Sequence, residues 1–165
     1  MDSDGDGDGY SITDGDCDDT RDDVYPYAIS FVPDDGTYST YHTEAHGSTC
    51  SFVDGDLSSV DIADNGDGTF ALNDGINTRN CCFVAGVDPL FTDFVCETVT
   101  SVETRTDSTV TTDQVISGYW CLTGTCDLAL IASYSASCTG SACLDDYPGT
   151  AAFPCEAKWS YLTSG

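Results

Sequence analysis

Aspartate dominates this chain, and its abundance limits the secondary structure that the chain can form. The 165 residues include 29 acidic side chains, 25 of them Asp and four Glu, against only four Lys and Arg. Asp, Gly, Ser and Thr are abundant and all disfavour helix interiors. Yet 40% of the residues are hydrophobic and 11% aromatic, which is too many for a disordered acidic chain. We therefore predict a folded, all-β protein.

The charge balance excludes several classes of partner. A net charge of −25 leaves no basic face for nucleic acid or for anionic lipid. No apolar run approaches the roughly 20 residues of a membrane-spanning helix, so we predict no membrane insertion. The length suits one domain of ordinary size.

Ten cysteines in a chain without any Cys-x-x-Cys pair predict a disulfide framework rather than a zinc or redox site. They are Cys17, Cys50, Cys81, Cys82, Cys96, Cys121, Cys126, Cys138, Cys143 and Cys155. A disulfide framework predicts a secreted, extracellular protein. Because Met1 is followed at once by an acidic segment, we expect a mature chain or one whose export signal has been removed.

The spacing of the cysteines suggests some pairings. Cys121 with Cys126 and Cys138 with Cys143 each enclose four residues including a Gly, which suits a bridge across a hairpin tip. The adjacent Cys81 and Cys82 would point to opposite faces of a strand and bond to different partners. A bridge from Cys17 to the rest of the chain would tie the acidic N-terminal segment to the fold.

Short runs rich in Thr, Val, Tyr and Phe alternate with turn clusters from residue 29 onward, which predicts an antiparallel β meander. The expected strands are 29–32, 37–42, 51–53, 60–62, 69–72, 94–105, 109–120, 128–137 and 157–163. The architecture is either an antiparallel β-sandwich or a closed barrel, with the sandwich slightly favoured. We divide the chain into an Asp-rich arm, 1–28, and a disulfide-stapled β domain, 29–165.

Aspartate alternates with glycine at the start of the chain, and this spacing suits a hard cation. Calcium takes about six to eight oxygen ligands, which short carboxylates on a tightly turning backbone can supply. A loop that starts at Asp2 ends on Thr13, which cannot close the site. A loop that starts two residues later offers a better set: Asp4, Asp6, Asp8, the Tyr10 carbonyl after the turn at Gly9, and Asp14 or Asp16 to close the shell.

This second loop carries a family resemblance. Asp-x-Asp-Gly-Asp-Gly-Tyr, Gly-Asp-Cys-Asp-Asp and Pro-x-Ala together resemble the Asp-rich metal-binding repeat of secreted bacterial surface proteins, which is similar in style to thrombospondin type 3 calcium repeats. The matching residues are Asp4, Asp6, Asp8, Gly9, Tyr10, Gly15, Asp16, Cys17, Asp18, Asp19, Pro26 and Ala28. The resemblance covers only residues 2–28 and implies calcium held by Asp4, Asp6, Asp8, Asp16, Asp18 and Asp19. The chain departs from the repeat at Tyr27, where Gly is usual, and lacks its second Cys-containing acidic motif.

Two other groups offer metal ligands, but each has a simpler interpretation that we prefer. The acidic stretch 61–68 contains Asn-Gly and Asp-Gly, which favour a hairpin turn without any ion. His42, Glu44 and His46 would share one face of a strand and could hold a transition metal. We interpret them instead as polar residues beside a loop.

Catalytic motifs are absent from the sequence, so we predict that the chain is not an enzyme. It has no Gly-x-Ser-x-Gly elbow, and full disulfide pairing would leave no Cys nucleophile. With so many Asp, pairs of carboxylates are expected anywhere and indicate nothing.

The leading hypothesis is a secreted bacterial calcium-binding protein with a structural or adhesive role at the cell surface, which self-associates into a filament or surface assembly. One alternative is an extracellular module that binds a glycan or a small ligand through exposed aromatic rings. The candidate rings are Tyr38, Tyr41, Tyr119, Trp120, Tyr134 and Trp159. A second alternative is a secreted hydrolase, which would need a cleft that gathers His42 or His46 with several acids.

Overall fold

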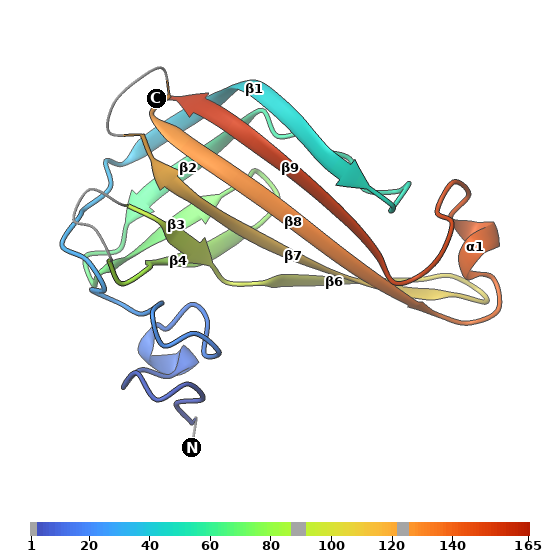
Figure 1. The fold of residues 1–165 in the computed structure, drawn as a ribbon, viewed down its shortest axis with the longest axis horizontal. Helices are drawn as coiled ribbons and strands as arrows, with labels where there is room; N and C mark the ends of the chain where they lie inside the picture. The colour runs from blue at the N-terminus through green and yellow to red at the C-terminus, as the bar shows by residue number, and fades with distance from the viewer. Residues whose placement is uncertain (1–2, 87–91, 122–125) are drawn as a thin grey trace.

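The computed structural model of the chain describes residues 3–86, 92–121 and 126–165. These residues form nine β-strands with two short helical turns (Figure 1). The strands are β1 (Gly36–Ser48), β2 (Ser59–Asp64), β3 (Thr69–Asn73), β4 (Thr78–Phe83), β5 (Phe94–Cys96), β6 (Val99–Thr104), β7 (Thr109–Trp120), β8 (Leu128–Thr139) and β9 (Cys155–Ser164). The helical turns are η1 (Ile12–Asp14) and α1 (Cys143–Asp146). No helix among the described residues has the length and apolar character to cross a membrane.

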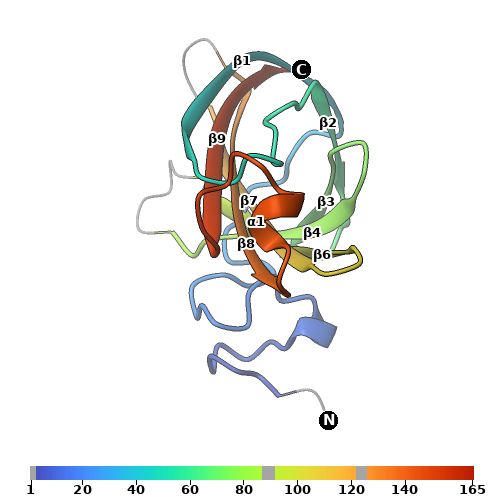
Figure 2. The same ribbon diagram turned by 90° about the vertical axis from the view of Figure 1, so that its right-hand side faces the viewer.

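The strands form one antiparallel sheet that closes on itself. Their order is β5-β4-β3-β2-β1-β9-β8-β7-β6, and β5 also pairs with the second half of β7. The first half of β7 pairs with β6, which lies outside the closed ring of eight strands. Figure 2 shows the strands surrounding a common axis. The all-β prediction is confirmed, and the architecture is the barrel rather than the sandwich that we favoured.

Most predicted strands are present, and the exceptions have physical reasons. The predicted 94–105 strand is divided into β5 and β6, because β7 changes its partner there. The segments 29–32 and 51–53 are not strands; Phe31 and Phe52 pack instead against the two hydrophobic clusters of the interior. The sequence pattern did not predict β4, because its polar residues Arg79 and Asn80 interrupt the run of β-branched and aromatic residues that is typical of a strand.

Aromatic rings fill one end of the barrel. Phe70, Phe83, Phe94 and Trp120 contact one another with ring centroids 5.0–6.5 Å apart. Phe31, in the segment before β1, packs against this group, 5.6 Å from the Phe83 ring and 5.4 Å from the Trp120 ring. Each fully buried side chain of this size stabilises the fold by about 1.5–3 kcal/mol. This end of the barrel is therefore a solid core.

Five disulfides staple the barrel, and all ten cysteines take part. The pairs are Cys17–Cys82, Cys50–Cys155, Cys81–Cys96, Cys121–Cys126 and Cys138–Cys143. Both predicted local bridges are confirmed, and so are the separate partners of Cys81 and Cys82. A fold with this many disulfides is compatible with an extracellular, oxidising environment.

The two disulfides with the most different loop lengths should contribute differently to stability. Cys50–Cys155 spans 105 residues and Cys138–Cys143 spans five. Chain entropy predicts a loss of about 5 kcal/mol for Cys50→Ser with Cys155→Ser, against about 2 kcal/mol for Cys138→Ser with Cys143→Ser. Guanidinium unfolding followed by Trp fluorescence measures both values. Equal losses would show that restriction of the unfolded chain is not the main effect.

Candidate metal centre in the N-terminal arm

Residues 3–28, called here the N-terminal arm, pack against the outer face of the barrel below β4 (Figure 1). The Cys17–Cys82 disulfide joins the arm to β4, and Val24 forms a β-bridge with Val84. Val24 is fully buried in a small hydrophobic cluster with both cysteines and Val95. The Asn80 side-chain amide adds a hydrogen bond to the Gly15 carbonyl, 3.3 Å long. The arm is thus anchored to the sheet at its second half.

The first loop of the arm is wound around a carboxylate. Asp4 Oδ1 accepts a hydrogen bond from the Gly7 N–H at 2.6 Å, and its Oδ2 accepts one from the Gly9 N–H at 3.0 Å. Gly9 has a φ of 100°, a backbone conformation that favours glycine. The loop turns tightly because these glycines allow it.

The segment around Asp19 returns to this loop and contacts it at Gly5. The Gly5 N–H donates to Asp19 Oδ1 at 2.7 Å. A Cβ at Gly5 would lie 2.6 Å from Asp19 Oδ2 and 2.7 Å from the Asp19 carbonyl oxygen. Only glycine therefore allows the two passes to approach each other so closely.

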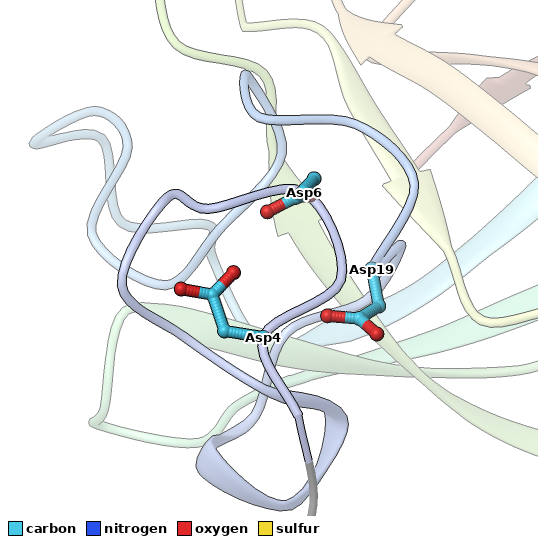
Figure 3. A group of neighbouring side chains, drawn as sticks. All are labelled: Asp4, Asp6 and Asp19. Carbon is cyan, nitrogen blue, oxygen red and sulfur yellow. The ribbon is translucent and has the colours of Figure 1, made fainter.

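This winding brings five carboxylates into two overlapping groups. One group contains Asp4, Asp6 and Asp19, which surround a common space in Figure 3, and the other contains Asp6, Asp8 and Asp16. Within each group, one oxygen of every carboxylate lies within 4.8 Å of the others. Asp6 belongs to both groups.

The second group is the more buried and has unsatisfied oxygens. In Asp6, Asp8 and Asp16, Oδ1 accepts a hydrogen bond from the backbone N–H two residues later, over 2.8–3.1 Å. The Oδ2 atom of all three is buried without a hydrogen-bond partner. Asp16 as a whole is 0% exposed. A buried, unpaired carboxylate oxygen is costly unless a cation or a proton neutralises it.

The electrostatics of the group reflect this crowding. Burial raises the pKa of Asp16, the carboxylates of Asp8, Asp6 and Asp19 raise it further, and the Asp18 N–H opposes them. Burial likewise raises the pKa of Asp6, and its acidic neighbours add to the effect. Both carboxylates are therefore harder to ionise than free Asp, as expected for a site that lacks positive charge.

Two of the other predicted ligands, Asp14 and Asp18, form local hydrogen bonds. Asp14 Oδ2 accepts hydrogen bonds from the N–H and hydroxyl of Ser11, at 3.3 and 2.7 Å, and Asp18 Oδ1 accepts one from the Thr20 N–H. Neither belongs to the two groups. The Tyr10 ring stacks on Tyr25 at 5.8 Å, and the predicted role of the Tyr10 carbonyl stays a prediction. Asp2 lies outside the described residues.

The departure from the repeat at Tyr27 has a conformational consequence. Tyr27 has a φ of 61°, in the left-handed region where glycine is favoured. Its N–H donates to the Gly68 carbonyl at 3.4 Å, and a Cβ at Gly68 would lie 2.4 Å from the Tyr27 nitrogen. The chain therefore adopts a glycine-type conformation here without a glycine, held by contact with the β2–β3 turn.

The two alternative metal groups are not assembled in the described part of the chain. His42, Glu44 and His46 are exposed on β1, and none of them belongs to a metal-binding group. Residues 64–69 form the predicted hairpin turn, in which Asp64 and Asp67 accept backbone hydrogen bonds from Gly66 and Thr69.

The aromatic residues considered for glycan stacking are divided between core and surface. Tyr38, Trp120 and Trp159 are buried, whereas Tyr41 and Tyr119 are about half exposed. A surface hollow of about 360 Å³ brings His46 near Asp113 and Glu156, and the His46 Nε2 atom lies 2.7 Å from Ser160 Oγ. The structure does not test whether the chain is an enzyme, so its absence of catalysis stays a prediction.

Comparison of the chain with known protein families, curated proteins and solved structures finds no match. The resemblance of residues 2–28 to a calcium-binding repeat stays a prediction.

The cost of the buried charge can be tested without any metal. Asp16→Asn keeps an oxygen that accepts the Asp18 N–H but removes one negative charge from the group. We expect the variant to unfold at a higher denaturant concentration than the unaltered protein when both contain a chelator. Asp22→Asn, on the exposed surface of the arm, is the matched control and should leave the midpoint unchanged. A lower midpoint for Asp16→Asn would contradict our interpretation that repulsion among the carboxylates of Asp6, Asp8 and Asp16 destabilises the metal-free protein.

Proposed function

We propose that the N-terminal arm is a calcium site of a secreted bacterial protein with a structural or adhesive role at the cell surface. The observation that carries the proposal is Asp16, a fully buried carboxylate whose Oδ2 atom has no partner and which lies beside Asp6 and Asp8. A cation among these three would neutralise the charge that burial makes costly.

The donor atoms favour calcium over a transition metal. Both groups consist of carboxylates alone, without His or Cys among the described residues, and oxygen donors suit hard cations. The winding of the loop on glycines would let further backbone or water oxygens complete the larger, flexible shell of calcium. Magnesium demands a stricter octahedron and is the weaker candidate.

Calcium at this site would also act on the barrel. Asp16 is followed by Cys17, which is bonded to Cys82 on β4, and the preceding Gly15 carbonyl accepts from Asn80. An ion bound to Asp16 would therefore fix the first half of the arm to a segment that the barrel already holds. This supports a structural role for the ion.

We propose that the partner of the protein is a second copy of the same chain, which would pair with the open edge of β6. Among the described strands, β6 pairs only with β7, so its other edge is open, and Val102 on it is 62% exposed. An open edge can add a strand from a second copy. With a net charge of −25, copies would repel one another until cations lower the charge.

Calcium titration of chelator-treated protein tests the site. For an extracellular module we expect a dissociation constant of about 10⁻⁴–10⁻³ M. At 10 mM calcium this stabilises the fold by about 1.4–2.7 kcal/mol, which chemical unfolding can measure. Asp16→Asn should weaken calcium binding at least about tenfold and lower the stabilisation at 10 mM calcium by at least about 1 kcal/mol, because it removes the negative charge of the buried ligand.

Asp14→Asn is the matched control, because Asp14 bonds to Ser11 and lies outside both groups. It should bind calcium as the unaltered protein does. If calcium binding were weakened in Asp14→Asn but unchanged in Asp16→Asn, Asp14 rather than Asp16 would complete the calcium shell. No binding at 10 mM calcium would refute the proposed site altogether.

Sedimentation velocity with and without calcium tests the assembly. We expect calcium to promote larger species, and Val102→Asp to reduce them by placing a charge on the open edge. Val32→Asp is the control, since Val32 is 64% exposed outside the strands. A protein that stays monomeric in excess calcium would end the assembly proposal but leave the calcium site intact.

A further inference from the structure

The interior of the barrel becomes polar away from the aromatic core. The Arg79 side chain is only 1% exposed and pairs with Asp74, at 2.7 Å between Nη2 and Oδ2. The same nitrogen donates to Gln114 Oε1 at 2.9 Å, and Gln114 Nε2 donates to the Tyr134 hydroxyl at 2.6 Å. This network joins the β3–β4 turn, β4, β7 and β8 in one rigid polar layer.

A cavity of about 490 Å³ lies next to this layer, between the 52–57 segment, the β3–β4 turn and β6. Gln114, Tyr134 and Tyr161 are among the polar residues that line it. Its lining is about equally polar and apolar, and the apolar residues include Phe52, Val53, Leu57, Ile76, Val102 and Ile116. We call it the barrel-end cavity. Its size lies within the range of about 300–1,000 Å³ that is typical of small-molecule sites, and barrel mouths are common places for them.

The charged side chains that line the barrel-end cavity are acidic. Among the described residues, four carboxylates line it, and no Lys, Arg or His does so. Asp74 is neutralised by Arg79, and Glu103 pairs with Arg105 at 3.0 Å. Asp54 and Asp56 have no ion pair in the described part of the chain and are exposed. These two, called the rim carboxylates, would attract a positively charged ligand.

We propose that the barrel-end cavity binds a small organic cation with an apolar body, such as an alkyl or aryl amine. The apolar walls would contact the body of the ligand, and the rim carboxylates would pair with its ammonium group. The rings of Tyr134 and Tyr161 would add favourable contact with aromatic or cationic groups. Arg79 has two buried donors without a partner, Nε and Nη1, but it does not line the cavity. Because these unpaired donors lie close to the cavity, an anionic ligand is the alternative, and the test must distinguish it from a cationic ligand.

Fluorescence titration with dansylcadaverine, an aromatic primary amine, tests the proposal in 10 mM calcium and 150 mM sodium chloride. The calcium would fill the site that we propose in the arm, and the salt screens weak attraction to the acidic surface. We expect saturable binding to one site. Asp54→Asn with Asp56→Asn should weaken it at least about tenfold, which corresponds to about 1.4 kcal/mol.

Asp35→Asn with Asp145→Asn is the matched control. This variant also loses two negative charges, but from exposed positions that do not line the cavity. Its dissociation constant for dansylcadaverine should stay within about twofold of that of the unaltered protein. Dansylglycine, which carries a carboxylate in place of the amine, should bind at least about tenfold more weakly.

Three results of the titrations would overturn the proposal: equal weakening in both double variants, dansylglycine binding as tightly as the amine, and no saturation up to 1 mM probe. Amide chemical shifts in NMR spectra provide the second readout: the largest changes should fall near Ile76, Val102 and Tyr134. Changes confined to the arm would also overturn the assignment to the cavity.

Discussion

The rest of the structure depends on the pairing that joins β5 to β7. Phe94 opposes Gly118 and Val95 opposes Ser117, and these pairs close the sheet into a barrel. Gly118 makes the approach possible, since a Cβ there would lie 2.1 Å from the Ala129 carbonyl and 2.9 Å from the Phe94 ring. Closure leaves the Phe94 ring in the aromatic core and Val95 on the outer face beneath the arm. The closed sheet thus supports both the core and the proposed calcium site.

Charge is the second organising constraint, and the chain cannot balance it internally. Its 29 acidic residues face only four Lys and Arg, and Arg21, Arg79 and Arg105 are already paired with acids. The remaining carboxylates include the crowded groups of the arm and the rim of the barrel-end cavity. Surface carboxylates are solvated and carry little cost, but the buried Asp16 is different. In our two proposals, cations from solution neutralise this charge: a metal ion in the arm and an organic cation at the rim.

Local features were predictable from the sequence because local geometry determines them. The Asp-Gly spacing predicted a loop of acidic ligands, and Asp4, Asp6, Asp8 and Asp16 belong to the two overlapping groups. The stretch 61–68 was correctly interpreted as a hairpin turn. The two short-range disulfides followed from their spacing. The close contact of Asp19 with Gly5 is a tertiary feature, although the family resemblance included Asp19 among the ligands. Asp14 and Asp18 fit the same acidic pattern, but their carboxylates bond within short turns instead.

Taken alone, the sequence determined an all-β, disulfide-linked fold with an acidic arm, because composition, turn residues and Cys spacing act over a few residues. Only the tertiary structure decided that the sheet is a barrel, since that depends on the pairing of β5 with β7 and on the space beside Gly118. It also decided that Arg79 lies inside the barrel and that a cavity remains beside it. Long-range contacts between residues far apart in the chain control these features, and no local pattern records them.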